Sequence, residues 1–109
     1  MTNRGPGFVV MYRWRLHPNA ETSFIDAWSR LTVLLGERGS LGSRLHRGPD
    51  SLWYGYAQWP SDEIRQRAFA NPVDPIASRQ MRAAIAEDFP ELVLESVLDY
   101  LVLPNAGKP

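Results

Sequence analysis

A run of β-branched and aromatic residues, FVVMYRWRL, spans positions 8–16 and has the composition of a β-strand. Alternation along this strand places one set of side chains on each face. One face carries Phe8, Val10, Tyr12, Trp14 and Leu16, and the other carries Val9, Met11, Arg13 and Arg15. Pro18 and Asn19 then end the strand. A second aromatic stretch, LWYGYAQW at 52–59, has the same strand-like character.

Helical spacing replaces alternation after the first strand. Apolar residues recur three or four positions apart at Phe24, Trp28, Leu31 and Leu35. We expect a helix from about residue 20, with Asn19 as its cap and Gly36 and Gly39 at its end.

The rest of the chain supplies two strands, two helical segments and a last strand. Strands at 41–47 and 52–59 flank the turn residues GPDS, which predict a hairpin. Ser61 caps a short helix that runs to about Phe69, and Asp74 with Pro75 starts another that runs to about Asp88. The alternating sequence ELVLESVLDYLVL predicts a long last strand over 91–103.

The order β-α-β-β-α-β predicts an α+β, ferredoxin-like domain over residues 8–103. Its four-stranded antiparallel sheet has the order 4-1-3-2, with the helices on one face. Residues 1–7 are expected to be a disordered lead-in and 104–109 a flexible tail. The opposite sheet face has no cover within one chain, which predicts a homodimer through this open face.

Composition limits the classes of partner and chemistry. The 109 residues carry 12 Lys and Arg against 12 Asp and Glu, which argues against nucleic acid or an anionic membrane as partner. The chain has no cysteine, so disulfides, thiol nucleophiles and Cys-ligated metals are excluded. Without an apolar leader core or a membrane-length apolar stretch, we expect a cytoplasmic protein.

Four features of the chain together resemble the antibiotic biosynthesis monooxygenase family. They are the first strand, Phe24 with Ala27-Trp28 in the first helix, the turn at 39–42, and the block Tyr56-Ala57-Gln58-Trp59-Pro60-Ser61. This family lies in the dimeric α+β barrel superfamily. The resemblance covers nearly the whole of 8–103. It implies a homodimer whose sheets pack face to face, with a cavity in each subunit between the sheet and the helices.

The resemblance also implies a function. Its enzymes oxygenate polycyclic phenols or quinols with neither metal nor flavin, so we expect no cofactor and an aromatic, polyketide-type or quinol substrate. The alternative is a non-catalytic homodimer of the same fold that binds a small hydrophobic ligand or has a regulatory role. The superfamily also includes haem-degrading enzymes, which resemble one another in an iron-binding histidine on the helix after the Trp. This function is disfavoured here because residues 61–88 contain no histidine.

Substrate-binding candidates are mostly aromatic. Trp59 matches the family's cavity-lining Trp, although a plain core position is the alternative. Gly55 lies on the same strand face and leaves room beside it. Trp28 fits a core position or a ligand wall. The full set of candidates is Trp59, Trp28, Trp14, Trp53, Gly55 and Phe69.

Two residues are candidates for proton transfer. Tyr12 shares a strand face with Trp14, and its hydroxyl could serve as a proton donor, although ordinary packing also explains it. His46 is the only histidine placed to act as a base, although as a strand residue it could also face solvent or the dimer. Two isolated histidines predict no metal site. Arg13 and Arg15 are expected to pair with Glu95 and Asp99 on the last strand rather than with a ligand.

Overall fold

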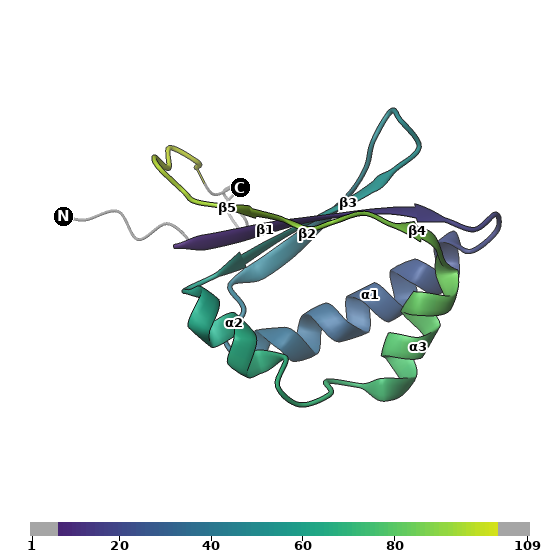
Figure 1. Cartoon of the computed structure of the whole chain (residues 1–109), viewed down its shortest axis with the longest axis horizontal. Coiled ribbons are helices and arrows are strands. Elements are labelled where there is room, and N and C mark those ends of the chain that lie inside the picture. The colour runs from purple at the N-terminus through teal and green to yellow at the C-terminus, as the bar shows by residue number, and fades with distance from the viewer. Residues whose placement is uncertain (1–6, 103–109) are drawn as a thin grey trace, which may run out of the picture.

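One antiparallel sheet carries three helices on a single face (Figure 1). The computed structural model describes residues 7–102. Its elements are β1 (Phe8–Leu16), α1 (Glu21–Gly36), β2 (Gly42–Arg47), β3 (Trp53–Trp59), α2 (Asp62–Ala68), α3 (Pro75–Ala84), β4 (Ile85–Asp88) and β5 (Leu92–Leu94). The predicted lead-in over residues 1–7, apart from Gly7, and the predicted tail over 104–109 lie outside the described residues.

The strand order confirms the predicted topology. The sheet runs β2-β3-β1-β4, and β5 pairs with β1 on the same side as β4. β1 and β3 are antiparallel neighbours, with Tyr12 opposite Gly55 and Trp14 opposite Trp53. The two aromatic-rich stretches therefore lie side by side at the centre of the sheet.

Several local predictions are also confirmed. Ser61 caps α2 by accepting a hydrogen bond from the Ile64 amide at 3.2 Å. Asp74 caps α3 by accepting from the amides of Ile76 and Ala77, and Pro75 occupies the first turn. These side chains satisfy amides that have no carbonyl partner inside the helix.

The predicted cap of the first helix is wrong. Asn19 adopts a left-handed turn conformation with φ of 66°, and Ala20 occupies the cap position without a side-chain hydrogen bond. Asparagine tolerates this backbone conformation better than most residues, so it serves the turn instead of the helix.

The predicted end of the chain is also wrong in two places. The helix ends at Ala84 rather than Asp88, because residues 85–88 form β4 and pair with β1. The last strand is much shorter than 91–103, since only Leu92–Leu94 pair with β1. Leu94 lies opposite Val9 and β1 begins at Phe8, so the strand has almost no neighbour left beyond Leu94.

The β1 arginines bind other partners than the expected Glu95 and Asp99, and within residues 7–102 only Arg15 of the two forms an ion pair. Arg15 pairs with Glu87 at 3.1 Å, and the Arg13 guanidinium donates to the Pro90 carbonyl at 3.2 Å. The β1–β4 register places Arg15 directly opposite Glu87, which explains the partner.

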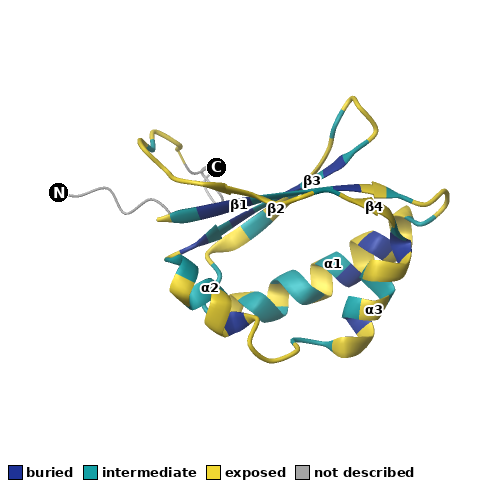
Figure 2. Ribbon diagram, viewed as in Figure 1, coloured by how far each residue is buried: buried dark blue, intermediate teal, exposed yellow. Residues whose placement is uncertain are grey.

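The buried residues belong to the central strands β1 and β3 and to the three helices (Figure 2). One core cluster contains Trp14, Phe24, Trp53 and Ala84, and a second contains Ala57, Trp59 and Ala68. They lie toward opposite ends of β3, and Tyr12 packs against both. The other face of the sheet is free of helices, and Leu92 and Leu94 on β5 are 45% and 42% exposed.

Candidate functional site

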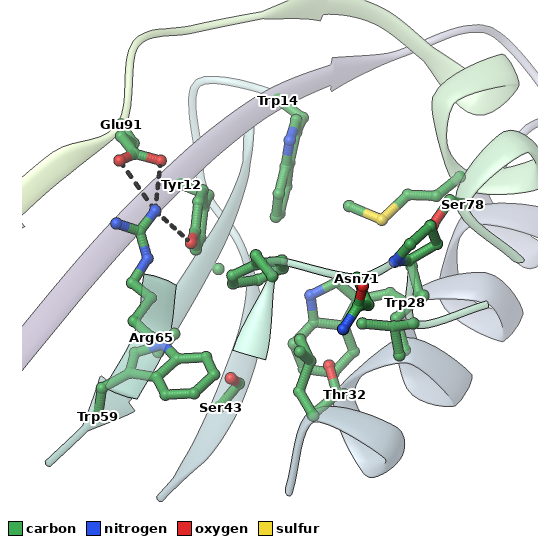
Figure 3. A pocket seen from close by; sticks show the side chains of 18 residues that line it. Tyr12, Trp14, Trp28, Thr32, Ser43, Trp59, Arg65, Asn71, Ser78 and Glu91 are labelled. Atoms are coloured by element: carbon green, nitrogen blue, oxygen red, sulfur yellow. Dashed lines mark hydrogen bonds and ion pairs between the residues drawn. The ribbon is translucent and has the colours of Figure 1, made fainter. Parts of the chain in front are cut away.

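A cavity of about 400 Å³ lies between the helix-covered face of the sheet and the three helices (Figure 3). β1, β2 and β3 form its ceiling, and α1 and α3 contribute the opposite walls. The segment between α2 and α3 closes a further side through Asn71, Pro72 and Val73. The cavity therefore depends on residues from nearly the whole chain.

Aromatic rings form much of its surface. Tyr12 and Trp14 project from β1 and stack with ring centroids 5.8 Å apart and planes 6° apart. Trp59 on β3 is almost fully buried and packs against Phe69 at 5.9 Å. Trp28 reaches the cavity from α1. Flat, apolar rings of this kind suit a flat, apolar ligand.

Small residues on β3 keep this space open. Gly55 and Ala57 alternate with outward-facing residues and present almost no side chain to the cavity. At Gly55 the Trp14 ring lies so near that an added Cβ would be 2.8 Å from the ring atom Cη2. The strand therefore needs glycine at this position because the indole crosses it closely.

One end of the cavity is polar. Arg65 on α2 donates from Nη2 to the Tyr12 hydroxyl at 3.1 Å and to both Glu91 carboxylate oxygens at 2.8 and 2.9 Å. The Arg65 side chain is only 15% exposed. These three side chains come from β1, α2 and the segment before β5, and they meet at the cavity (Figure 3).

The Tyr12 hydroxyl is held in its neutral form. Burial raises the pKa of Tyr12 above its ordinary value of 10.0, although the Arg65 hydrogen bond acts in the opposite direction. Because this hydroxyl accepts from Arg65, its own proton stays available to a ligand. Within residues 7–102 Tyr12 donates to no protein acceptor. Tyr12 can therefore act as a hydrogen-bond donor toward the cavity.

Solved structures share this arrangement of strands and helices. SnoaB, a cofactor-independent oxygenase from Streptomyces nogalater, superposes with a TM-score of 0.73 at 17% identity, covering 85% of this chain and 95% of SnoaB. A candidate antibiotic biosynthesis monooxygenase from Caulobacter crescentus CB15 gives 0.74 at 14% identity, covering 87% and 93%. The chain has the fold of the antibiotic biosynthesis monooxygenases.

Rv0793 from Mycobacterium tuberculosis shares this monooxygenase fold with a TM-score of 0.71 at 12% identity, covering 86% of this chain and 98% of Rv0793. No family model matches the sequence, and neither does any curated protein. The resemblance predicted from the sequence is thus confirmed at the level of the fold, and these low identities carry no residue role across.

Six of the predicted site residues meet in the cavity of this monooxygenase fold. They are the aromatic and small residues of the central strands and the first two helical segments: Tyr12, Trp14, Trp28, Gly55, Trp59 and Phe69. Their meeting follows from the predicted pairing of β1 with β3 and from the helices that pack against that face of the sheet.

Two predicted residues lie elsewhere. Trp53 is buried against Phe24, with ring centroids 5.8 Å apart, and belongs to the core beside the cavity. His46 is exposed on β2, where Ser43 lines the cavity. Alternation then points His46 to the opposite face of the sheet. The structure therefore does not place this imidazole where it could act as a base in the cavity.

Arg65 and Glu91 are the charged cavity residues that the sequence reasoning missed. One signal was present: Arg65 precedes Ala68 and Phe69 by three and four positions, and these residues face inward. An arginine on the inward side of a short helix indicates a special role. Nothing in the sequence connects it to Glu91, which is 26 positions away.

Neither a cluster of metal ligands nor a membrane-spanning helix is found in residues 7–102. Among residues 7–102, no three His, Cys, Asp or Glu side chains come together as they would to hold a metal ion. No helix of that region has the length and apolar character needed to cross a membrane.

Proposed function

We propose that this protein is an oxygenase that acts on a hydroxylated aromatic molecule without a bound metal or flavin. One observation carries the proposal: a neutral tyrosine hydroxyl, oriented by Arg65, projects into a cavity walled by aromatic rings. Such a cavity holds a flat ring system against Trp59 and Trp14, and Tyr12 would fix the position of one ligand oxygen.

The proposed reaction draws its electrons from the substrate. Loss of a proton makes the phenol or its keto tautomer electron-rich at a ring carbon, and that carbon reduces dioxygen to a carbon-bound peroxide. Loss of water leaves a carbonyl, so that an anthrone and one O₂ give a quinone and one H₂O. Tyr12 and Arg65 would stabilise negative charge as it develops on the substrate oxygen.

Oxygen uptake tests this proposal. The purified protein is mixed with anthrone or 1-naphthol, each of which gives a quinone and one H₂O with one O₂, and a protein-free sample measures spontaneous oxidation. Tyr12→Phe removes the hydroxyl that faces the cavity and should lower the protein-dependent rate at least about tenfold. Tyr54→Phe is the matched control, because the Tyr54 hydroxyl donates to Asp50 in the β2–β3 hairpin, away from the cavity. A rate no higher than the protein-free rate would rule out the oxygenase.

A non-catalytic ligand carrier is the second candidate, and the placement of His46 favours it. With this imidazole on the other sheet face, the cavity lacks the base that the sequence reasoning considered. Native mass spectrometry of the protein as isolated separates the two functions. A retained small molecule without oxygen uptake on any test substrate identifies a carrier.

We also propose that the open sheet face is covered by a second copy of the chain. The β1–β5 register places Leu92 opposite Met11 and Leu94 opposite Val9, so apolar side chains gather on the face without helices. A surface of this kind favours association with an identical surface. Light scattering should then give about 25 kDa, twice the chain mass of 12.4 kDa. The cytoplasmic location stays a prediction from the sequence.

A further inference from the structure

We infer that Glu91 is the base that accepts the ligand's hydroxyl proton, and that Arg65 is the cation shared between Glu91 and the oxyanion formed. The inference rests on the proposed oxygenase and supplies a step that it requires. Two parts of the inference, the preference for a neutral ligand and the pairing of Arg65 with Glu91, are tested by ligand binding without turnover.

Arg65 holds both groups through one nitrogen. Nη2 lies 3.1 Å from the Tyr12 hydroxyl and 2.8 and 2.9 Å from the two Glu91 oxygens. This nitrogen carries two hydrogens, so three acceptors share two donors. The Glu91 carboxylate therefore competes for the Arg65 cation with the Tyr12 hydroxyl oxygen and with any ligand oxygen bound beside it. A negative charge that appears beside Tyr12 would draw Arg65 away from Glu91.

Arg65 itself has little freedom to leave the cavity. Its guanidinium lies 5.9 Å from the centroids of the Phe8 and Phe69 rings, and its buried Nε has no hydrogen-bond partner within residues 7–102. A change of partner at Nη2 thus needs only a small rotation of a side chain held between two rings.

Glu91 is placed both to take a proton and to release it. Its carboxylate lines the cavity, yet the side chain is 42% exposed, which gives the proton a route to solvent. The segment that carries it is anchored to β1, since the Phe89 amide donates to the Arg13 carbonyl and Arg13 donates to the Pro90 carbonyl. A general base needs this combination of fixed position and access to water.

The proton transfer balances in charge. A neutral hydroxyl ligand enters beside a neutral Arg65–Glu91 pair, its O–H bond breaks, and the proton forms a new O–H bond on Glu91. The electron pair stays on the ligand oxygen, which becomes the new partner of the Arg65 cation. Because the pair is already neutral, a ligand that arrives as an anion has to displace the Glu91 carboxylate. The wild-type cavity should therefore prefer a neutral hydroxyarene to an anionic arene.

Binding of two probes of similar shape tests the charge pairing. 2-Naphthol is neutral at pH 7 and 2-naphthoate is an anion, and quenching of tryptophan fluorescence reports their binding. We expect the wild-type protein to prefer naphthol. Glu91→Gln should keep naphthol affinity within about threefold and raise naphthoate affinity at least about tenfold, because Arg65 then loses its nearest carboxylate and keeps only Asp62, whose Oδ1 lies 3.7 Å from Nη1. Glu87→Gln is the matched control, since Glu87 pairs with exposed Arg15 outside the cavity, and it should bind both probes as wild type does.

Turnover tests the base. With 1-naphthol, Glu91→Gln should lower the rate of oxygen uptake about a hundredfold or more, while Glu87→Gln keeps it. Full turnover by Glu91→Gln would overturn the base alone. An unchanged ratio of naphthoate to naphthol affinity in that variant would overturn the charge pairing. A wild-type protein that binds naphthol but consumes no oxygen would overturn the oxygenase and the base together.

Discussion

Replacement of Gly55 by alanine gives a direct test of how the cavity ceiling is built. A methyl group at Gly55 would lie 2.8 Å from Cη2 and 2.9 Å from Cζ3 of Trp14, where ordinary contacts begin near 3.4 Å. The indole is 5% exposed and packs edge-on against Phe24 at 5.2 Å, so it has little room to move away from the sheet. The ring must therefore shift toward the cavity.

The expected loss of stability follows from two opposing terms. Overpacking by one methyl group costs about 1–3 kcal/mol, and alanine recovers about 0.5–1 kcal/mol because it is less flexible than glycine in a strand. The net loss in the free energy of unfolding is about 0–2.5 kcal/mol, centred near 1 kcal/mol. At about 4 °C per kcal/mol for a chain of this length, the melting temperature should fall by up to about 10 °C, with about 5 °C at the centre of the range.

Gly36→Ala is the matched control for this measurement. It makes the same chemical change in α1, where an added Cβ would have no neighbour within 4 Å. Alanine should raise stability there by about 0.4–1 kcal/mol. Thermal unfolding followed by circular dichroism compares the two variants. A Gly55→Ala protein that melts above the wild-type temperature, as Gly36→Ala should, would refute the close crossing of Trp14 over β3.

Four further predictions concern the cap, the cavity wall, the tyrosine and the open face. Asp74→Ala should lower the free energy of unfolding, measured by urea denaturation, by about 0.5–2 kcal/mol, because two α3 amides lose their acceptor. Arg38→Ala should speed amide exchange in residues 69–73 about tenfold, as seen by mass spectrometry, since its guanidinium donates to the Ala68, Asn71 and Pro72 carbonyls; unchanged exchange would contradict this. The raised pKa of Tyr12, caused mainly by burial, means that the unfolded chain loses this proton first. The stability that the protonated Tyr12 contributes is therefore present below pH 10 and is lost as pH rises through the folded-state pKa. Urea unfolding at pH 8 and at pH 11 measures the fall in the free energy of unfolding between them, and this fall should be smaller in Tyr12→Phe than in wild type. Leu92→Glu should convert a dimer to monomers in light scattering, whereas Val93→Glu, at the next position on the other face of β5, should not.

The sequence predicted well wherever a short pattern determines local structure. Alternation in 8–16 and 53–59, the turn between β2 and β3, and the Asp74-Pro75 helix start each depend on neighbouring residues, and each forms as expected. Their order along the chain then leaves few topologies, which is why the strand order was also predictable.

The end of the chain shows why pattern alone is insufficient. Residues 85–88, IAED, continue a helical composition, yet pairing with β1 makes them a strand. Residues beyond Leu94 alternate as a strand does, but β1 offers almost no further partner once Leu94 lies opposite Val9. Alternation is a property of one segment, whereas a strand also requires a neighbour.

The site divides in the same way. Its aromatic walls come from strands whose adjacency the topology predicts, so Tyr12 and Trp14 were identified in this way, while the family resemblance indicated Trp59. Its polar end joins Tyr12 to Arg65 across 53 positions and Arg65 to Glu91 across 26. No spacing rule connects residues that distant, because their meeting depends on where a short helix and a connecting segment cross the sheet.

The cavity itself can be traced to one face of β3. Its helix-facing residues read Trp53, Gly55, Ala57 and Trp59, two large side chains with two small ones between them. Trp53 fills the space beside Phe24 and Trp59 fills the space near Ala68, so the sheet and helices are held apart at both ends. The small residues between them cannot fill the middle. A strand that reads large-small-small-large on its buried face thus specifies a core and a cavity together. Because the Trp14 ring already covers Gly55, the cavity should be closed from Ala57, where a larger side chain should fill it before the fold is disturbed.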